Sequence, residues 1–155
     1  MGPRLTERLT LGALVVRPPW HSFDEAVRGL VHELVVAGHL APVAEGAAVR
    51  AVLEREAMAS TALVEIGVSM PHARVAGIDA SVAALAVSPT AVYYASAEVP
   101  ITIVALLLSP PSASGAHLSD LSSLSMLLQS ERTRRRLQNV TTAAEAHEII
   151  RSQWR

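Results

Sequence analysis

The 155-residue sequence contains no cysteine. Without thiols the protein has no disulfide framework and no thiolate chemistry. Such a chain suits a reducing compartment, and we expect a cytoplasmic location. Any nucleophile that this protein uses has to come from another kind of side chain.

Aromatic residues are also scarce, at 3% of the chain, whereas hydrophobic residues make up 50%. A core with so few aromatic rings has to be built from Val, Leu, Ile and Ala, which favours helices packed closely on a sheet. A chain of this length buries roughly two-thirds of its unfolded surface as one domain. We predict a single layered α/β domain spanning residues 1–155.

Long apolar runs are missing as well. The longest aliphatic stretch, residues 101–108, is broken only by Thr102 and is far shorter than the ~18 residues that a membrane span requires. It is typical of a strand covered on both faces. Residues 1–7 are polar, and no apolar signal segment follows them. We therefore expect no insertion into a membrane.

Neither sign of charge dominates, because 13 basic and 14 acidic residues give a net charge of -1. This balance leaves no electrostatic footprint for nucleic acid. The one basic cluster is typical of a solvated helix face and consists of Arg132, Arg134, Arg135 and Arg136. No histidine pair or Asp-rich loop has the spacing of metal ligands. We predict no bound metal and no cofactor.

Apolar periodicity predicts that strands alternate with helices. The first helix begins at a capping box, with Ser22 at the cap and Glu25 three residues later, and ends at Gly38. A second helix over residues 45–58 brings Arg55 close to the loop that follows it. Strand-like stretches cover residues 11–16, 61–70, 81–87 and 101–108, with a short strand or turn at residues 92–94.

After a loop rich in Ser, Gly and Pro at residues 110–115, the remainder of the chain is predicted to be helical. A leucine stripe from Leu118 to Leu128 marks the first of these helices. A short helix follows around residues 133–137. The capping box from Thr142 to Glu145 opens a last helix that runs through Ile150.

The candidate reactive group is His72, which follows the apolar run that ends at Pro71. Pro71 has no backbone N–H and a fixed φ, so we expect it to end regular strand pairing and to present His72 at the edge of the sheet. His117 is predicted to lie on a loop just before a helix, and Arg74 follows closely after His72. A neutral imidazole is a nucleophile and an acid–base group near neutral pH. Two such histidines with an arginine nearby indicate chemistry on an anion.

These residues also stand in a familiar order. Their order along the chain resembles that of one protein family. The predicted first strand and two helices are followed by Arg55-Glu56, Ser60-Thr61, the segment from Gly67 to Arg74 and finally His117-Leu118. The family is the enzyme IIA domain of the fructose/mannitol type in the bacterial phosphotransferase system, with its nitrogen-regulatory branch. The resemblance extends from about Leu9 to Trp154 and implies a mixed central sheet of about four to five strands flanked by helices.

The resemblance implies a role for each candidate residue. His72 would accept a phosphoryl group, and His117 would hydrogen-bond its oxygens or orient the ring. Arg55, and with it Ser60 and Thr61, would supply further donors. The transition state spreads charge over three oxygens, so the protein has to supply position and donors rather than a strong base. A planar guanidinium matches phosphate oxygens well.

The resemblance also implies the partners. A histidine phosphocarrier protein would donate the phosphoryl group. A IIB component that carries a cysteine would accept it for sugar uptake. In the nitrogen-type branch, a regulatory target protein would take the place of the IIB component. A degenerate interaction module that is never phosphorylated is the third possibility, and the presence of His72, His117 and Arg55 counts against it.

One segment departs from the family pattern. Residues 62–66 replace a glycine-rich stretch and make this connection about one residue longer than the family pattern has it. Glu65 in this segment would repel a phosphate if it faced the site, so we expect it to point to solvent.

The supporting residues also have simpler readings: His117 as a helix cap, Arg55 as a solvated charge at a helix end, and Arg74 as a solvated or partner-facing residue. The resemblance to the enzyme IIA family makes a geometric prediction that these simpler interpretations do not make. The strand at residues 101–108 should run beside the one that ends at Met70, so that His72 and His117 converge on one shallow site.

Overall fold

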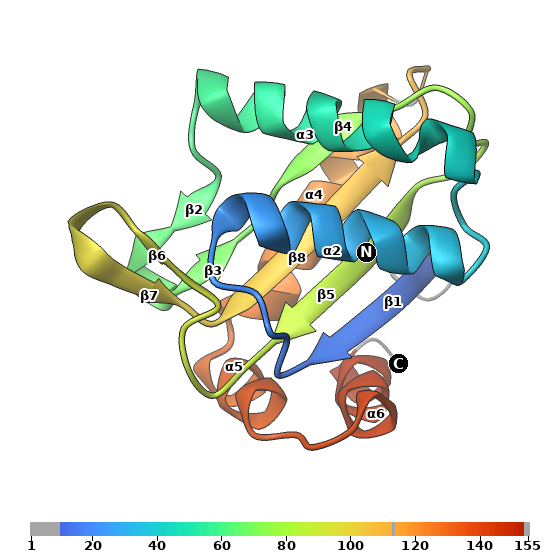
Figure 1. Ribbon diagram of the computed structural model, residues 1–155. Helices are drawn as coiled ribbons and strands as arrows, with labels where there is room; N and C mark the ends of the chain where they lie inside the picture. Colours follow the sequence, from blue (N-terminus) through green and yellow to red (C-terminus); the bar gives the residue numbers. More distant parts are fainter. Residues whose placement is uncertain (1–9, 113, 154–155) are drawn as a thin grey trace.

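The computed structural model describes residues 10–112 and 114–153 and has a mixed sheet with helices on both faces (Figure 1). This arrangement confirms the predicted layered α/β fold. The polar N-terminal segment, residues 1–7, and the predicted ends of the core, Leu9 and Trp154, lie outside the described residues. Within the described ranges, no helix is both long enough and apolar enough to cross a bilayer.

The sheet follows the order β1-β5-β8-β3-β2, with β4 also paired to β8. Its strands are β1 (Thr10–Val16), β2 (Ala62–Leu63), β3 (Val68–Ser69), β4 (His72–Arg74), β5 (Val82–Val87) and β8 (Ile103–Ser109). β1 runs parallel to β5, and β5 antiparallel to β8. β3 and β4 both run parallel to β8. The pairing of β3 with β8 confirms that the run ending at Met70 lies beside the central apolar strand.

The helices form two outer layers (Figure 1). On one face lie α2 (Phe23–Val36) and α3 (Glu45–Met58), with the turn Pro42–Ala44 between them; on the other lie α4 (Ser114–Gln129), α5 (Glu131–Gln138) and α6 (Ala143–Gln153). As predicted, the Ser22 side chain caps α2 and accepts a hydrogen bond from the Glu25 backbone N–H at 3.0 Å. Such a cap satisfies one of the amides that a helix N-terminus leaves free.

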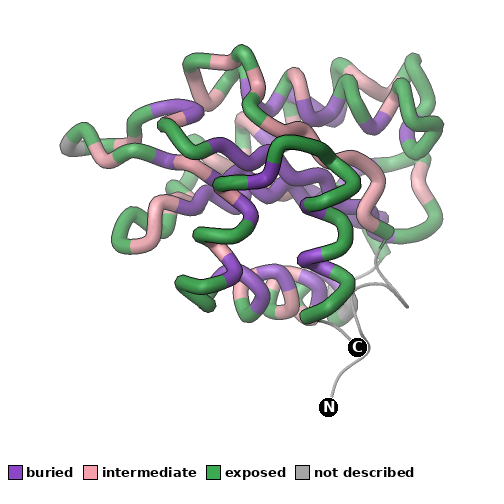
Figure 2. Tube along the Cα trace, turned by 90° about the horizontal axis from the view of Figure 1, so that it is seen from below, coloured by how far each residue is buried: buried purple, intermediate pink, exposed green. Residues whose placement is uncertain are grey.

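Every residue of β5 and β8 is buried, and the period of two along each strand divides them between two cores. Ala84 and Leu106 pack with α2 and α3, whereas Leu85 and Leu107 pack with the three later helices. Figure 2 shows the buried strands enclosed between helices whose outer sides are exposed. The expectation of a strand covered on both faces is confirmed for this part of the chain.

The prediction of one strand over residues 61–70 is wrong. A short 3-10 turn at Val64–Ile66 separates β2 from β3 and ends at Gly67, whose φ of 67° lies in the left-handed region. A side chain there would be strained, and its Cβ would lie 3.0 Å from the Pro100 carbonyl oxygen. Glycine is needed at this point because the chain turns tightly against its neighbour.

The apolar run at residues 101–108 is also divided. Ile101 ends β7 (Val99–Ile101), which pairs with β6 (Tyr93–Ala95) in a two-stranded sheet joined by the turn Ser96–Glu98. The break falls at Thr102, whose backbone N–H donates to the Gly67 carbonyl at 2.9 Å. Of the strand or turn predicted at residues 92–94, the structure has the strand, shifted to Tyr93–Ala95, and its partner β7 was not predicted.

Two predictions next to the histidines need correction. Pro71 does not end the pairing, because His72 begins β4 and lies opposite Leu107. Proline lacks a donor but keeps its acceptor, and the Pro71 carbonyl receives the Leu107 N–H at 3.0 Å. His117 lies not on a loop but in the first turn of α4. The predicted leucine stripe is also wrong at its first residue, because Leu118 is 67% exposed whereas Leu124 and Leu128 are buried.

Candidate functional site

His72 is a half-buried histidine in the first position of β4. Its Nδ1 lies 2.9 Å from the Met70 carbonyl oxygen. A carbonyl oxygen can only accept, so Nδ1 carries the proton and donates it. The other ring nitrogen, Nε2, is left with a lone pair. The backbone thus holds the ring as the tautomer whose Nε2 is the nucleophile.

The ring of His117 lies beside the ring of His72, so the predicted convergence of the two histidines is confirmed. The two ring centroids are 5.3 Å apart, and the ring planes are inclined by 55°. The topology explains this proximity, because β4 runs parallel to the end of β8 and the chain passes from β8 directly into α4. The side chains therefore converge at one edge of the sheet, although many residues separate them in the sequence.

Two buried serines support His117, and the sequence analysis did not identify either. The Nδ1 of His117 lies 2.7 Å from the Ser109 hydroxyl oxygen, and the Ser81 hydroxyl donates to the same oxygen at 3.2 Å. Ser109 is fully buried, and Ser81 is nearly so. The available signal was a polar residue at the end of each of two apolar strands, a pattern common to many strand ends.

The pKa of His117 is lowered from its ordinary value of 6.5. Burial of the ring is the largest cause, followed by the nearby His72 and Arg74; Asp120 opposes the shift, and Arg55 adds slightly to it. His117 is therefore neutral at neutral pH, with one N–H donor and one acceptor.

Two arginines reach this site from different elements. Arg55, in the last turn of α3, is half-buried and donates one N–H to the Ala59 carbonyl at 3.2 Å. Arg74 ends β4 and, two residues after His72, lies on the same side of that strand. Arg74 is exposed, as its simpler reading has it, yet its charge lowers the pKa of His117 more than the charge of Arg55 does.

Ser60 and Thr61 have local partners. The Thr61 hydroxyl donates to Glu56 at 2.5 Å, and the Thr61 backbone N–H donates to the same carboxylate at 2.8 Å. The Ser60 hydroxyl accepts from the Ala62 backbone N–H at 3.2 Å. A hydroxyl has one proton, so the proton of Thr61 is committed to Glu56. Their contact with a phosphoryl group stays a prediction.

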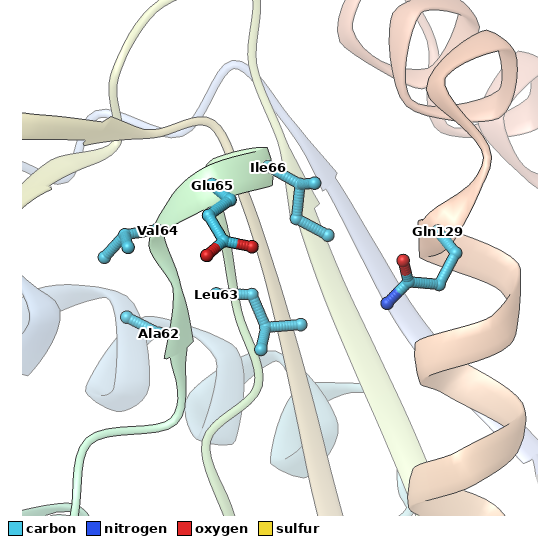
Figure 3. Close-up of a pocket in the computed structure, with 6 residues that line it drawn as sticks. All are labelled: Ala62, Leu63, Val64, Glu65, Ile66 and Gln129. Atoms are coloured by element: carbon cyan, nitrogen blue, oxygen red, sulfur yellow. The ribbon is translucent and has the colours of Figure 1, made fainter.

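The unusual segment at residues 62–66 lines a separate pocket of about 220 Å³. Figure 3 shows the segment facing Gln129 of α4 across this pocket. Glu65 is exposed, as expected. The lining residues include neither of the paired histidines nor either arginine, so this pocket is distinct from the histidine site. No group of three or more potential metal ligands occurs among residues 10–112 and 114–153.

The geometry thus defines a class of protein: a mixed α/β domain that brings two histidines and two arginines together at one edge of its sheet. The family described as the phosphoenolpyruvate-dependent sugar phosphotransferase system, EIIA 2, matches residues 12–153. The chain belongs to this family, which confirms the resemblance found in the sequence.

One curated relative is the PTS system 2-O-alpha-mannosyl-D-glycerate-specific EIIABC component of Escherichia coli (strain K12). The two are 28% identical over 136 residues, which are 86% of this chain and 20% of the relative. The chain thus spans about one fifth of the length of that protein.

Solved structures share the fold. The nitrogen regulatory protein IIA-Ntr from Neisseria meningitidis superposes with a TM-score of 0.73 at 24% identity, covering 92% of this chain and 95% of that one. The IIA mannitol protein from Escherichia coli gives a TM-score of 0.69 at 20% identity, covering 90% and 95%. A complex of enzyme IIAMtl with phosphorylated enzyme IIBMtl from Escherichia coli gives 0.70 at 19% identity, covering 93% and 99%.

Proposed function

We propose that this protein is a phosphoryl carrier that accepts a phosphoryl group on His72 from a histidine phosphocarrier protein and passes it to a IIB component. One observation carries the proposal: His72 has its Nδ1 proton bound by the Met70 carbonyl, which leaves the Nε2 lone pair free beside a neutral His117. Membership of the phosphotransferase EIIA family also supports the proposal. We place the relay in the cytoplasm, where phosphoenolpyruvate is made.

The transfer needs no cofactor. The Nε2 lone pair of His72 forms a bond to phosphorus while the phosphorus–nitrogen bond of the donor phosphohistidine breaks, and that electron pair stays on the donor imidazole. The proton of His72 stays on Nδ1, where it is hydrogen-bonded to the Met70 carbonyl oxygen throughout. In the second step a cysteine thiolate of the IIB component attacks phosphorus, and the electron pair returns to Nε2. Both steps conserve charge and protons.

The neighbouring groups stabilise the charge that spreads over the phosphoryl oxygens. His117 supplies one N–H donor. Arg55 and Arg74 supply guanidinium groups, one from the end of α3 and one from β4. Preorganised donors of this kind act most strongly where the charge develops in the transition state. Ser60 and Thr61 are possible further donors only after their present hydrogen bonds break.

A regulatory carrier is the second candidate function. It would use the same chemistry at His72 but act by phosphorylation-dependent binding to a target protein. The structural similarity to IIA-Ntr from Neisseria meningitidis favours it. Transfer from the phosphorylated protein to a IIB component would support the first role, whereas a target bound in only one phosphorylation state would support the second.

The phosphorylation assay tests the common step. The protein is incubated with phosphoenolpyruvate, enzyme I and a histidine phosphocarrier protein, and its intact mass is measured at neutral pH. We expect one added phosphoryl group that is lost in acid, because phosphohistidine is acid-labile. The His72→Ala variant should show no addition.

The matched control is His147→Ala, which removes an exposed histidine on α6. It should be labelled like the unaltered protein. Stable labelling of His72→Ala would show that another residue accepts the phosphoryl group and would reject the proposal.

A further inference from the structure

Ser81, Ser109 and His117 form a buried chain of hydrogen bonds behind the reactive ring. We propose that Ser109, held in place by Ser81, is a positioning residue that fixes His117 as the tautomer with its proton on Nε2. The tautomer assignment is argued from the hydrogen-bond geometry alone. The benefit of that tautomer for transfer rests on the proposed function. It assigns a role to two serines that have no part in the transfer itself.

Counting the protons along these hydrogen bonds shows which group donates in each of them. The Ser81 hydroxyl donates its only proton to the Ser109 oxygen at 3.2 Å. The Ser109 hydroxyl then has its own proton to place, and the Nδ1 of His117 lies 2.7 Å away. With Ser109 donating, Nδ1 is the acceptor. A neutral imidazole carries one proton, so that proton is on Nε2.

The fold holds the two serines in register. β5 and β8 are antiparallel, with Val82 opposite Leu108, so the next pair outward is Ser81 opposite Ser109. Both serines are buried at the ends of fully buried strands, so their hydroxyls depend on each other and on His117 for the hydrogen bonds described above. The burial of Ser109 also excludes water that would otherwise offer Nδ1 a different partner.

The two histidines then have opposite roles. The Met70 carbonyl gives His72 an Nε2 lone pair, which attacks phosphorus, and Ser109 gives His117 an Nε2 proton, which binds a phosphoryl oxygen. The other tautomer of His117 would present a lone pair to the negatively charged oxygens and repel them. One backbone acceptor and one hydroxyl donor thus set complementary tautomers on adjacent rings.

Nitrogen-15 NMR of the unphosphorylated protein tests the assignment directly. Long-range proton–nitrogen spectra distinguish the tautomers of a histidine by the pattern of their cross-peaks. We expect His117 with its proton on Nε2 and His72 with its proton on Nδ1. In Ser109→Ala, His117 should become a mixture of tautomers, while His72 serves as an internal reference because its backbone partner is unchanged. Ser81→Ala should shift His117 in the same direction to a smaller extent.

The rate of phosphoryl transfer gives the second measurement. Ser109→Ala should slow transfer by about tenfold, the lower end of what is lost when the partner that orients a histidine is removed. The matched control is Ser88→Ala, since Ser88 is a buried serine at the opposite end of β5 whose hydroxyl bonds only to Thr90 among the described residues. That variant should change neither the tautomer nor the rate.

The outcomes separate this inference from the proposed function. His117 with its proton on Nδ1 in the unaltered protein would overturn the inference, and so would an unchanged tautomer in a folded Ser109→Ala variant. Neither result bears on whether His72 is phosphorylated. Absence of phosphorylation in the unaltered protein would instead reject the proposed function and leave the tautomer assignment standing.

Discussion

At the residue scale, His117 combines burial with an ionisable ring, and this combination makes the stability of the fold depend on pH. Its pKa in the folded protein is lower than the ordinary 6.5, chiefly because the ring is buried. Below about pH 6.5 the unfolded chain therefore binds a proton that the folded protein still excludes. The contribution of His117 to stability is complete above that pH and falls as the pH decreases toward the folded-state pKa.

We expect the free energy of unfolding to fall between about pH 7 and pH 5 more steeply for the unaltered protein than for His117→Gln. Urea unfolding at a series of pH values measures both slopes. The comparison isolates His117 from the other five histidines of the chain, which both proteins share. Equal slopes would contradict the burial of a neutral ring.

The arginines allow a test that separates transfer from folding. Arg55→Gln and Arg74→Gln should each slow phosphoryl transfer by about 10²-fold, the scale of losing one preorganised donor. Because neither arginine lies in the core, each change should shift the free energy of unfolding by less than about 1 kcal/mol. Arg151→Gln on α6, which breaks an exposed ion pair with Glu148, is the control. Lowered stability with unchanged rates would assign the arginines a structural role.

At the element scale, local chemistry predicted some features well. The first helix begins at Ser22 because its capping box is a short-range signal, and the sequence contains all of it. The second helix matches its predicted bounds of residues 45–58. The central apolar run forms a buried strand from Ile103 onward, since a continuous apolar run fits a strand with both faces covered, although Ile101 belongs to β7.

Elements that depend on distant partners were predicted less well. Pro71 predicts the end of a strand, yet β4 forms directly after it because the Pro71 carbonyl accepts a hydrogen bond from the Leu107 N–H of another strand. The hairpin of β6 and β7 likewise depends on a pairing that crosses a turn. Local patterns do not contain such pairings, so the tertiary contact decided the outcome.

The candidate site shows the same division. Its reactive residues came from motifs that are contiguous in the sequence, such as Pro71-His72. Its supporting hydroxyls, Ser81 and Ser109, come together only through the register of two strands. A serine at a strand end has no distinguishing feature until the partner strand is known. The role of each residue in transfer stays a prediction until the assays above are done.

At the scale of the whole molecule, the two cores share one sheet. Leu106 and Leu107 are consecutive residues of β8, both fully buried, and they pack on opposite faces. Replacing either with alanine leaves a cavity, and we expect each change to lower the free energy of unfolding by about 2–5 kcal/mol. Because the same strand serves both cores, we expect one cooperative transition in each variant.

Circular dichroism and native-state hydrogen exchange check this prediction. Exchange in α2 and in α6, which lie on opposite faces, should accelerate together in both variants. Two separate transitions, with each variant affecting only its own face, would show that the faces unfold independently.

The attachment of β4 to the fully buried β8 has a consequence for the proposed phosphorylation of His72. His72 is paired with Leu107 of a strand whose residues are all buried, and its tautomer is set by the Met70 carbonyl in the short connection before β4. Interiors this closely packed do not deform gradually, so an added phosphoryl group has no nearby hinge to move. If His72 is phosphorylated as proposed, we expect the difference between the two states to be confined to the surface around His72. Under the proposed function, we expect a protein that responds to one state to contact that surface directly.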